Sequence, residues 1–176
     1  MTATALPRPL AARETFRYHW LRLRAVAHPT EDVERVRRAV AFVAGAQAAP
    51  AAQPESSGSL PSGSDPVVDT QMETHHGLTS HVLEATLEKS RPLRDVLGRV
   101  LAVPGARARL LATLEARTDD DGVLYVRLDK QAAYQGRLEL TQGEDCVQLR
   151  LKVEAYPSGR EAALATLGRM LEAERP

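Results

Sequence analysis

The sequence predicts an α+β fold, in which a mixed, mainly antiparallel sheet carries helices packed on one face. Several segments alternate apolar and polar residues with a period of two, as strands do when only one of their faces is buried. Other segments repeat apolar residues at the spacing of a helix face. Along the chain the segments run as strand, helix, hairpin, two helices, three strands and helix, an order typical of an α+β domain.

The first element is a strand over residues 15–28, with the sequence TFRYHWLRLRAVAH. Its polar face carries Tyr18, Trp20, Arg22 and Arg24. Thr30 follows as the predicted N-cap of a helix, because its hydroxyl can accept a hydrogen bond from an amide of the first turn. Valines at helical spacing continue this helix to about Gly45.

Residues 46–66 consist mainly of Ala, Pro, Ser and Gly, with almost no large apolar side chain. Such a segment buries too little surface to offset the entropy lost on ordering, so we expect a flexible insert within one domain. The next two segments, residues 67–74 and 82–89, are extended and are separated by a turn around Gly77. Together they predict a hairpin.

A pair of helices is expected after the hairpin. Ser90 is the predicted N-cap of the first, and Pro92 lies in its first turn, where the missing amide of proline costs least. Residues 103–105, with the sequence VPG, break this helix. A second helical segment then runs to about Arg117.

Three further strands and a final helix complete the predicted fold. Residues 123–129 and 146–155 alternate regularly, and residues 137–140 are expected to form a short strand between them. Residues 130–136 lose the alternation and predict a short helical turn or crossover. The apolar residues of 160–174 recur at helical spacing.

The composition fits one domain of common size. We expect residues 1–14 to be a disordered tail and residues 15–175 to form a single domain that contains the insert. Lys and Arg together number 23, as do Asp and Glu, so the net charge is zero. Twenty of the cations are arginines. This bias mildly favours an RNA partner, although a GC-rich genome produces the same bias.

Cysteine content and hydropathy indicate the compartment. Cys146 is the single cysteine, so the chain forms no intrachain disulfide, as is typical of a reducing compartment. We expect it to be a small core residue rather than a nucleophile. No apolar run is long enough to span a membrane, and the start of the chain lacks the apolar core of a signal peptide. We therefore expect a cytoplasmic protein with no membrane partner.

The polar faces of the strands collect rings and cations on the side opposite the helices. These side chains are Tyr18, Trp20, Arg22, Arg24, Tyr125, Arg127, Gln148, Arg150 and Lys152. Rings can stack on unpaired bases and cations can bind phosphates, so this face is a candidate RNA-binding surface. The alternatives are a self-association surface and a solvated face with cross-strand ion pairs. The acidic side chains expected on the same face are Glu84, Glu88, Glu139 and Glu154.

Two segments raise the question of a metal or a catalytic centre. His75, His76 and His81 could ligate a metal, but their spacing matches no established motif and favours a polar turn. Asp119 to Asp121 could serve a metal-dependent nuclease, but such catalysis needs carboxylates from different elements, and a run that ends in glycine is typical of a turn. We therefore expect a protein that is not an enzyme and that holds no cofactor or metal.

Three motifs, ETHHG, LYVRLDKQAAYQG and LRLKVEAYP, resemble segments of a known family. From about Tyr18 to Glu172 the chain resembles the archaeal family of predicted RNA-binding proteins described as exosome-subunit-like. The resemblance implies an α+β fold similar to that of a large-subunit ribosomal protein, dimeric members and a role with RNA. The N-terminal tail and the insert depart from the compact pattern of that family.

The resemblance also implies site residues in the turn and around the end of the strand at 123–129. They are His75, His76, Gly77, Arg127, Asp129, Lys130, Gln131, Tyr134 and Gly136. We expect Lys130, at the strand end, to contact a phosphate. Asp129 can instead hold the turn through backbone hydrogen bonds. Tyr134 can either stack on a base or pack against the protein.

The resulting hypothesis is a non-catalytic RNA-binding protein linked to RNA processing by the exosome or to ribosome function. Its predicted contacts are Trp20, Arg22, Arg24, His75, His76, Arg127, Lys130, Gln131, Tyr134, Arg150 and Lys152. The expected partners are ribosomal or other structured RNA and proteins associated with the exosome or the ribosome. The alternative is a protein-interaction module that forms a homodimer or docks a partner through the open sheet face.

Overall fold

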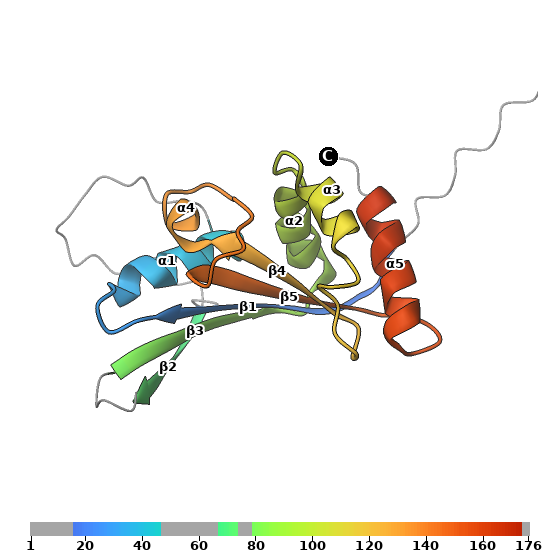
Figure 1. Ribbon diagram of the computed structural model, residues 1–176. Helices are drawn as coiled ribbons and strands as arrows, with labels where there is room; N and C mark the ends of the chain where they lie inside the picture. Colours follow the sequence, from blue (N-terminus) through green and yellow to red (C-terminus); the bar gives the residue numbers. More distant parts are fainter. Residues whose placement is uncertain (1–15, 47–66, 74–78, 174–176) are drawn as a thin grey trace, which may run out of the picture.

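The computed structural model describes residues 16–46, 67–73 and 79–173, and it confirms the α+β class. Five strands form one antiparallel sheet in the order β2-β3-β1-β5-β4, with the helices on one side (Figure 1). The strands are β1 (Tyr18–Ala27), β2 (Val67–Glu73), β3 (Thr79–Leu87), β4 (Val123–Asp129) and β5 (Cys146–Val153). The helices are α1 (Val33–Val43), α2 (Ser90–Leu101), α3 (Ala106–Ala112), α4 (Lys130–Tyr134) and α5 (Arg160–Ala173).

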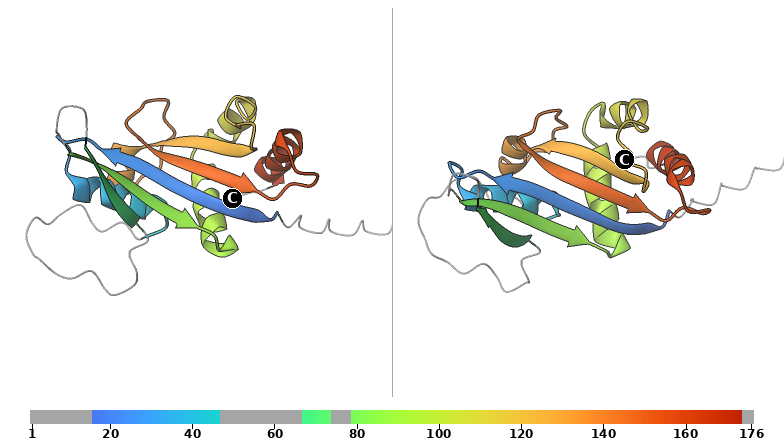
Figure 2. Two further views of the ribbon diagram at one scale, coloured as in Figure 1. Left: turned by 90° about the horizontal axis from the view of Figure 1, so that it is seen from below. Right: turned by 60° about the horizontal axis from the view of Figure 1, so that its bottom comes forward.

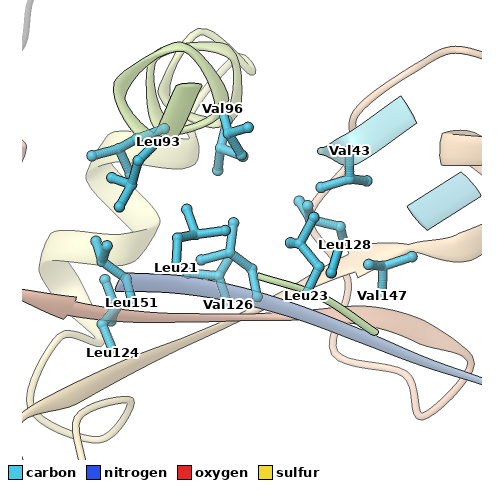
Figure 3. Packing of buried hydrophobic residues seen from close by; sticks show 14 of the residues in the cluster. Leu21, Leu23, Val43, Leu93, Val96, Leu124, Val126, Leu128, Val147 and Leu151 are labelled. Atoms are coloured by element: carbon cyan, nitrogen blue, oxygen red, sulfur yellow. The ribbon is translucent and has the colours of Figure 1, made fainter. Parts of the chain in front are cut away.

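The core lies between the helices and one face of the sheet. Leu21 and Leu23 of β1 have no exposed surface, and they point toward the helices together with alternate residues of β4 and β5. Figure 3 shows Leu93 and Val96 of α2 and Val43 of α1 facing these strand residues. Because strand side chains alternate, the same backbone presents a second face to the opposite side. We call that uncovered side the open face; Figure 2 shows it in front of the helices.

The two edges of the sheet differ. The amide of Tyr125 on β4 donates to the carbonyl of Arg117 at 2.9 Å, and the carbonyl of Arg127 accepts from the amide of Thr141 at 3.0 Å. Irregular segments therefore cover the outer edge of β4. Residues 137–140, expected to form a strand, supply part of this cover but make only an isolated bridge through Leu140, so that prediction is wrong. At the other edge, no described strand pairs with the outer side of β2.

Tyr18 does not lie on the open face as predicted. The β1–β5 register shifts between Tyr18 and Trp20, so that the two residues face neighbouring partners on β5, Val153 and Lys152. The extra residue turns Tyr18 into the core, where it is 6% exposed. A period-two pattern contains no signal for such a bulge, and the prediction therefore extended the alternation one step too far.

Other local predictions also need correction. Asp32, not Thr30, caps α1, because its carboxylate accepts from the first-turn amides. Ser90 lies inside α2, which has no side-chain N-cap. Cys146 is half-buried on the open side of β5 rather than in the core. The predicted tail and insert lie outside the described residues. None of the described helices has the length and apolar content needed to cross a bilayer.

The core predicts how stability responds to truncation. Leu23→Ala removes a side chain that is completely buried at the centre of the sheet, so it should lower the free energy of unfolding by about 2–5 kcal/mol. Gln71→Ala changes an exposed side chain of the edge strand and should shift the free energy of unfolding by less than about 0.5 kcal/mol. Urea denaturation of both variants would measure the difference. Equal losses would contradict this location of the core.

Candidate nucleic-acid interface

The cross-strand register brings six of the predicted contacts together on the open face. Trp20, Arg22 and Arg24 project from β1, the central strand of the sheet. Opposite them on β5 lie Lys152, Arg150 and Gln148, in that order. On β4, the residues opposite Arg150 and Gln148 are Tyr125 and Arg127. The six gathered contacts are Trp20, Arg22, Arg24, Arg127, Arg150 and Lys152.

This part of the sheet is positively charged although the whole chain is neutral. The strand positions on the open face carry five cations and two carboxylates. One carboxylate, Glu84, lies 3.6 Å from Nε of Arg24. The other, Asp129, accepts from the amide of Ala132 at 2.7 Å and so caps α4. Glu88 and Glu154 follow the ends of β3 and β5, so they do not offset the charge at its centre.

Two arginines stack on the two rings of this face. The guanidinium of Arg22 lies 4.5 Å from the centroid of the Trp20 ring, and that of Arg150 lies 5.5 Å from the Tyr125 ring. Arg150 is further fixed by Gln148, whose Oε1 accepts from Nε at 3.0 Å and from Nη2 at 2.8 Å. Each guanidinium thus makes a cation–π contact with a ring, and arginine and aromatic side chains are the groups on which unpaired bases stack.

The Asp119–Asp121 segment forms a turn that supports this face. Asp119 accepts from the amide of Val123 at 2.8 Å and from the hydroxyl of Tyr125 at 2.9 Å. Burial raises the pKa of Asp119, but these hydrogen bonds outweigh it and the net pKa is lowered. The hydrogen bond to Asp119 is the main reason that the pKa of Tyr125 is raised. Lys152 donates to the carbonyl of Asp121. The carboxylate of Asp119 therefore positions the ring of Tyr125.

Lys130 lies away from the open face. Its side chain is 3% exposed, and its ammonium donates to the carbonyl of Val26 at 3.1 Å and to Glu31 at 2.8 Å. A third partner is Asp145. An ammonium held by three acceptors and buried from solvent has no position open for a phosphate. The structure therefore contradicts the predicted phosphate contact and makes Lys130 a link between segments far apart in the sequence.

Gln131 and Tyr134 lie near Lys130, in a cleft of about 300 Å³ on the helix side. The Tyr134 ring packs partly against the core, and the guanidinium of Arg35 from α1 covers it at 5.6 Å. Because the cleft and the open face lie on opposite sides of the sheet, the predicted contacts do not form one continuous site. His75 and His76 lie outside the described residues.

Comparison with known proteins decides the family. A model of the family described as RNA binding matches residues 20–153. The chain belongs to this RNA-binding family. The match begins at Trp20 and ends at the last residue of β5, so it contains all six contacts gathered on the open face.

Individual proteins are similar to this chain along most of its length. RNA-binding protein PAB1135 of Pyrococcus abyssi is 31% identical over 158 residues, which cover 89% of this chain and 95% of that protein. Protein AF2318 of Archaeoglobus fulgidus is 30% identical with a TM-score of 0.67, over 88% of this chain and 99% of that one. Mth689 of Methanothermobacter thermautotrophicus, a DUF54 protein, is 31% identical with a TM-score of 0.66, over 88% and 98%.

His81 has a structural role that the sequence did not reveal. Its Nδ1 lies 3.0 Å from Oδ1 of Asp69, and Arg37 of α1 donates to Oδ2 of the same carboxylate at 3.2 Å. The cluster joins the edge strand β2 to α1, on the side of the sheet opposite the open face. Among the described residues, no group of three or more His, Cys, Asp and Glu side chains is placed to hold a metal ion. In this RNA-binding family member, His81 thus stabilises the hairpin.

The link between Lys130 and Glu31 predicts a pH dependence of stability. Burial raises the pKa of Glu31, but hydrogen bonds from Lys130 and from the His28 amide outweigh it, so the net pKa falls below the ordinary 4.5. Ionised Glu31 therefore stabilises the fold above about pH 4.5, and this contribution is lost as the pH falls through the lower, folded-state pKa. Glu31→Gln should flatten the decline of melting temperature between about pH 5 and pH 3.

The matched control is Glu88→Gln, which changes an exposed carboxyl beyond the end of β3. In this variant the melting temperature should fall with decreasing pH as it does in the unmodified protein. Thermal melts of the three proteins at half-unit pH intervals would measure this. A Glu31→Gln curve parallel to that of the unmodified protein would contradict the role given to Glu31.

Proposed function

We propose that this chain binds RNA, without catalysis, through the open face of its sheet. The observation that supports the proposal is the concentration of five cations and two rings on an uncovered face of a chain whose net charge is zero. Membership of a family described as RNA binding agrees with it. The protein as a whole does not attract a polyanion, so the attraction must be local.

The spacing of the cations makes a local attraction effective. Neighbouring strands lie about 4.8 Å apart, and alternate residues of one strand lie about 6.8 Å apart. Both spacings are shorter than the Debye length of about 8 Å at physiological ionic strength. Arg22, Arg150 and Lys152 occupy such neighbouring positions. Their fields therefore add before salt screens them, and a phosphate backbone crossing the face meets several charges at once.

The biological setting of the RNA is a further part of this proposal. The resemblance to exosome-subunit-like proteins supports RNA processing or ribosome function as that setting. Crosslinking in cells, followed by sequencing of the bound RNA, would identify the transcripts. Enrichment of ribosomal RNA or of processing intermediates is the expected result, and a random sample of abundant transcripts would contradict this part.

Removing two central charges should weaken binding and its dependence on salt. The double variant Arg22→Ala, Arg150→Ala deletes directly opposite cations on β1 and β5. On a single strand each lost phosphate contact lowers the slope of log K against log salt by about 0.7, so the expected decrease is about 1.4. Fluorescence anisotropy of labelled RNA at several salt concentrations would measure it.

The control removes two exposed arginines from the helix side, Arg38→Ala with Arg91→Ala. It changes the net charge equally and should leave both affinity and slope within about twofold of the unmodified protein. If the two double variants weaken binding equally, RNA responds to overall charge and the open face is not the site.

A second candidate function is self-association through β2. Val68 is 64% exposed and Met72 is 51% exposed, both on the open side of this edge strand. Antiparallel pairing of two β2 strands around Thr70 would place Val68 opposite Met72 of the second copy. Such pairing satisfies edge amides and covers both apolar side chains, which is the usual reason that an edge strand recruits a copy. We propose this dimer alongside RNA binding, since it leaves the cations of β1, β4 and β5 uncovered.

Light scattering would test the dimer. The unmodified protein should have twice the mass of one chain, and Met72→Lys should shift it toward one chain by placing a charge in the apolar pair. Gln71→Lys adds the same charge to the helix side of the strand and should keep the dimer. A monomer at high protein concentration, before any substitution, would overturn this candidate.

A further inference from the structure

Arg22 differs from the other cations of the open face in its partners. Arg24 pairs with Glu84, and Arg127 donates to the carbonyl of Gln142 at 3.2 Å. Arg150 and Lys152 also have protein acceptors. Within the described part of the chain, the guanidinium of Arg22 contacts the Trp20 ring and has no hydrogen bond or ion pair to the protein. Arg22 is also exposed, whereas the other four cations are half-buried.

The neighbour of Arg22 makes this lack of an acceptor more significant. Arg22 lies directly opposite Arg150 in the β1–β5 register. Like charges directly opposite each other on two strands destabilise a sheet. The two arginines lie at the centre of the face, with Trp20 next to Arg22 along β1 and Tyr125 opposite Arg150 on β4. An anion that bridges the two guanidiniums would relieve the repulsion and fill the open donors of Arg22.

Two guanidinium–ring stacks lie next to each other at this place. One is Arg22 on Trp20, and the other is Arg150 on Tyr125. A guanidinium is itself planar, and bases stack on arginine guanidiniums as they do on aromatic rings. Each stack thus combines a platform for a base with donors for the adjacent phosphate. Unpaired, splayed nucleotides use both features.

A duplex could use only half of this arrangement. The bases of an RNA duplex are stacked inside it, and its deep major groove admits no side chains. It would offer phosphates to the cations and nothing to the platforms. On these grounds we propose that the ligand is single-stranded RNA, with successive bases stacked on the Arg22–Trp20 and Arg150–Tyr125 pairs. This inference rests on the proposed RNA-binding function and specifies the class of RNA.

The chain offers a direct optical test, because Trp20 is its single tryptophan. The protein is titrated with a fluorescently silent oligouridylate and, separately, with the duplex of that oligonucleotide and oligoadenylate. Stacking near Trp20 should change its emission on addition of the single strand, and the single strand should bind at least tenfold more tightly than the duplex. Equal affinity for the two, or emission that stays constant at saturation, would overturn the inference.

A conservative pair of variants separates stacking from charge. Arg22→Lys keeps the charge but loses the planar group, so affinity for the single strand should fall about fivefold to tenfold with an unchanged salt slope. Arg24→Lys is the matched control two residues along the same strand, where no ring stacks, and should change affinity less than twofold. Melting curves of both variants confirm that they are folded. An Arg22→Lys affinity equal to that of the unmodified protein would contradict the stacking role.

The results also distinguish this inference from the proposed function. If the duplex binds as well as the single strand and both respond to the Arg22→Ala, Arg150→Ala variant, the open face is an RNA site of another class. If neither nucleic acid binds the unmodified protein, the proposed function itself fails. Preference for the single strand with loss in Arg22→Lys supports both.

Discussion

Burial of one face of the sheet determines the rest of this structure. Leucines and valines of β1, β4 and β5 pack under the helices, and each of them fixes the direction of its two neighbours along the strand. Residues between buried leucines therefore have to face away from the core. Antiparallel pairing then sets rows of these outward side chains across the sheet. The position of every ring and cation on the open face is thus a consequence of the core.

Alternation in the sequence was sufficient to predict this face, because the period of two is local. Trp20, Arg22 and Arg24 are on it for the same reason that Leu21 and Leu23 are buried. Features that depend on tertiary context could not be predicted. A bulge turned Tyr18 inward, and the strand expected at 137–140 became an irregular edge cover.

Lys130 shows a second limit of sequence reasoning. Its place at a strand end predicts a surface role, but its acceptor Glu31 lies 99 residues away along the chain. No periodicity connects positions so far apart. The segment RLDKQAAYQG therefore contains both surface and structural residues. Arg127 faces outward, whereas Lys130 bonds both to the loop before α1 and to the segment before β5. Residues of this motif therefore maintain the fold as well as any interface.

The irregular segments along β4 have a consequence for assembly. Hydrogen bonds with residues 117 and 141 cover the outer edge of β4, so among the strands that the structure describes only β2 offers an edge for strand addition. A sheet with one available edge can pair with one further sheet, and the pair then has no free edge for a third. Any association by this route ends as a closed pair and does not grow into a filament.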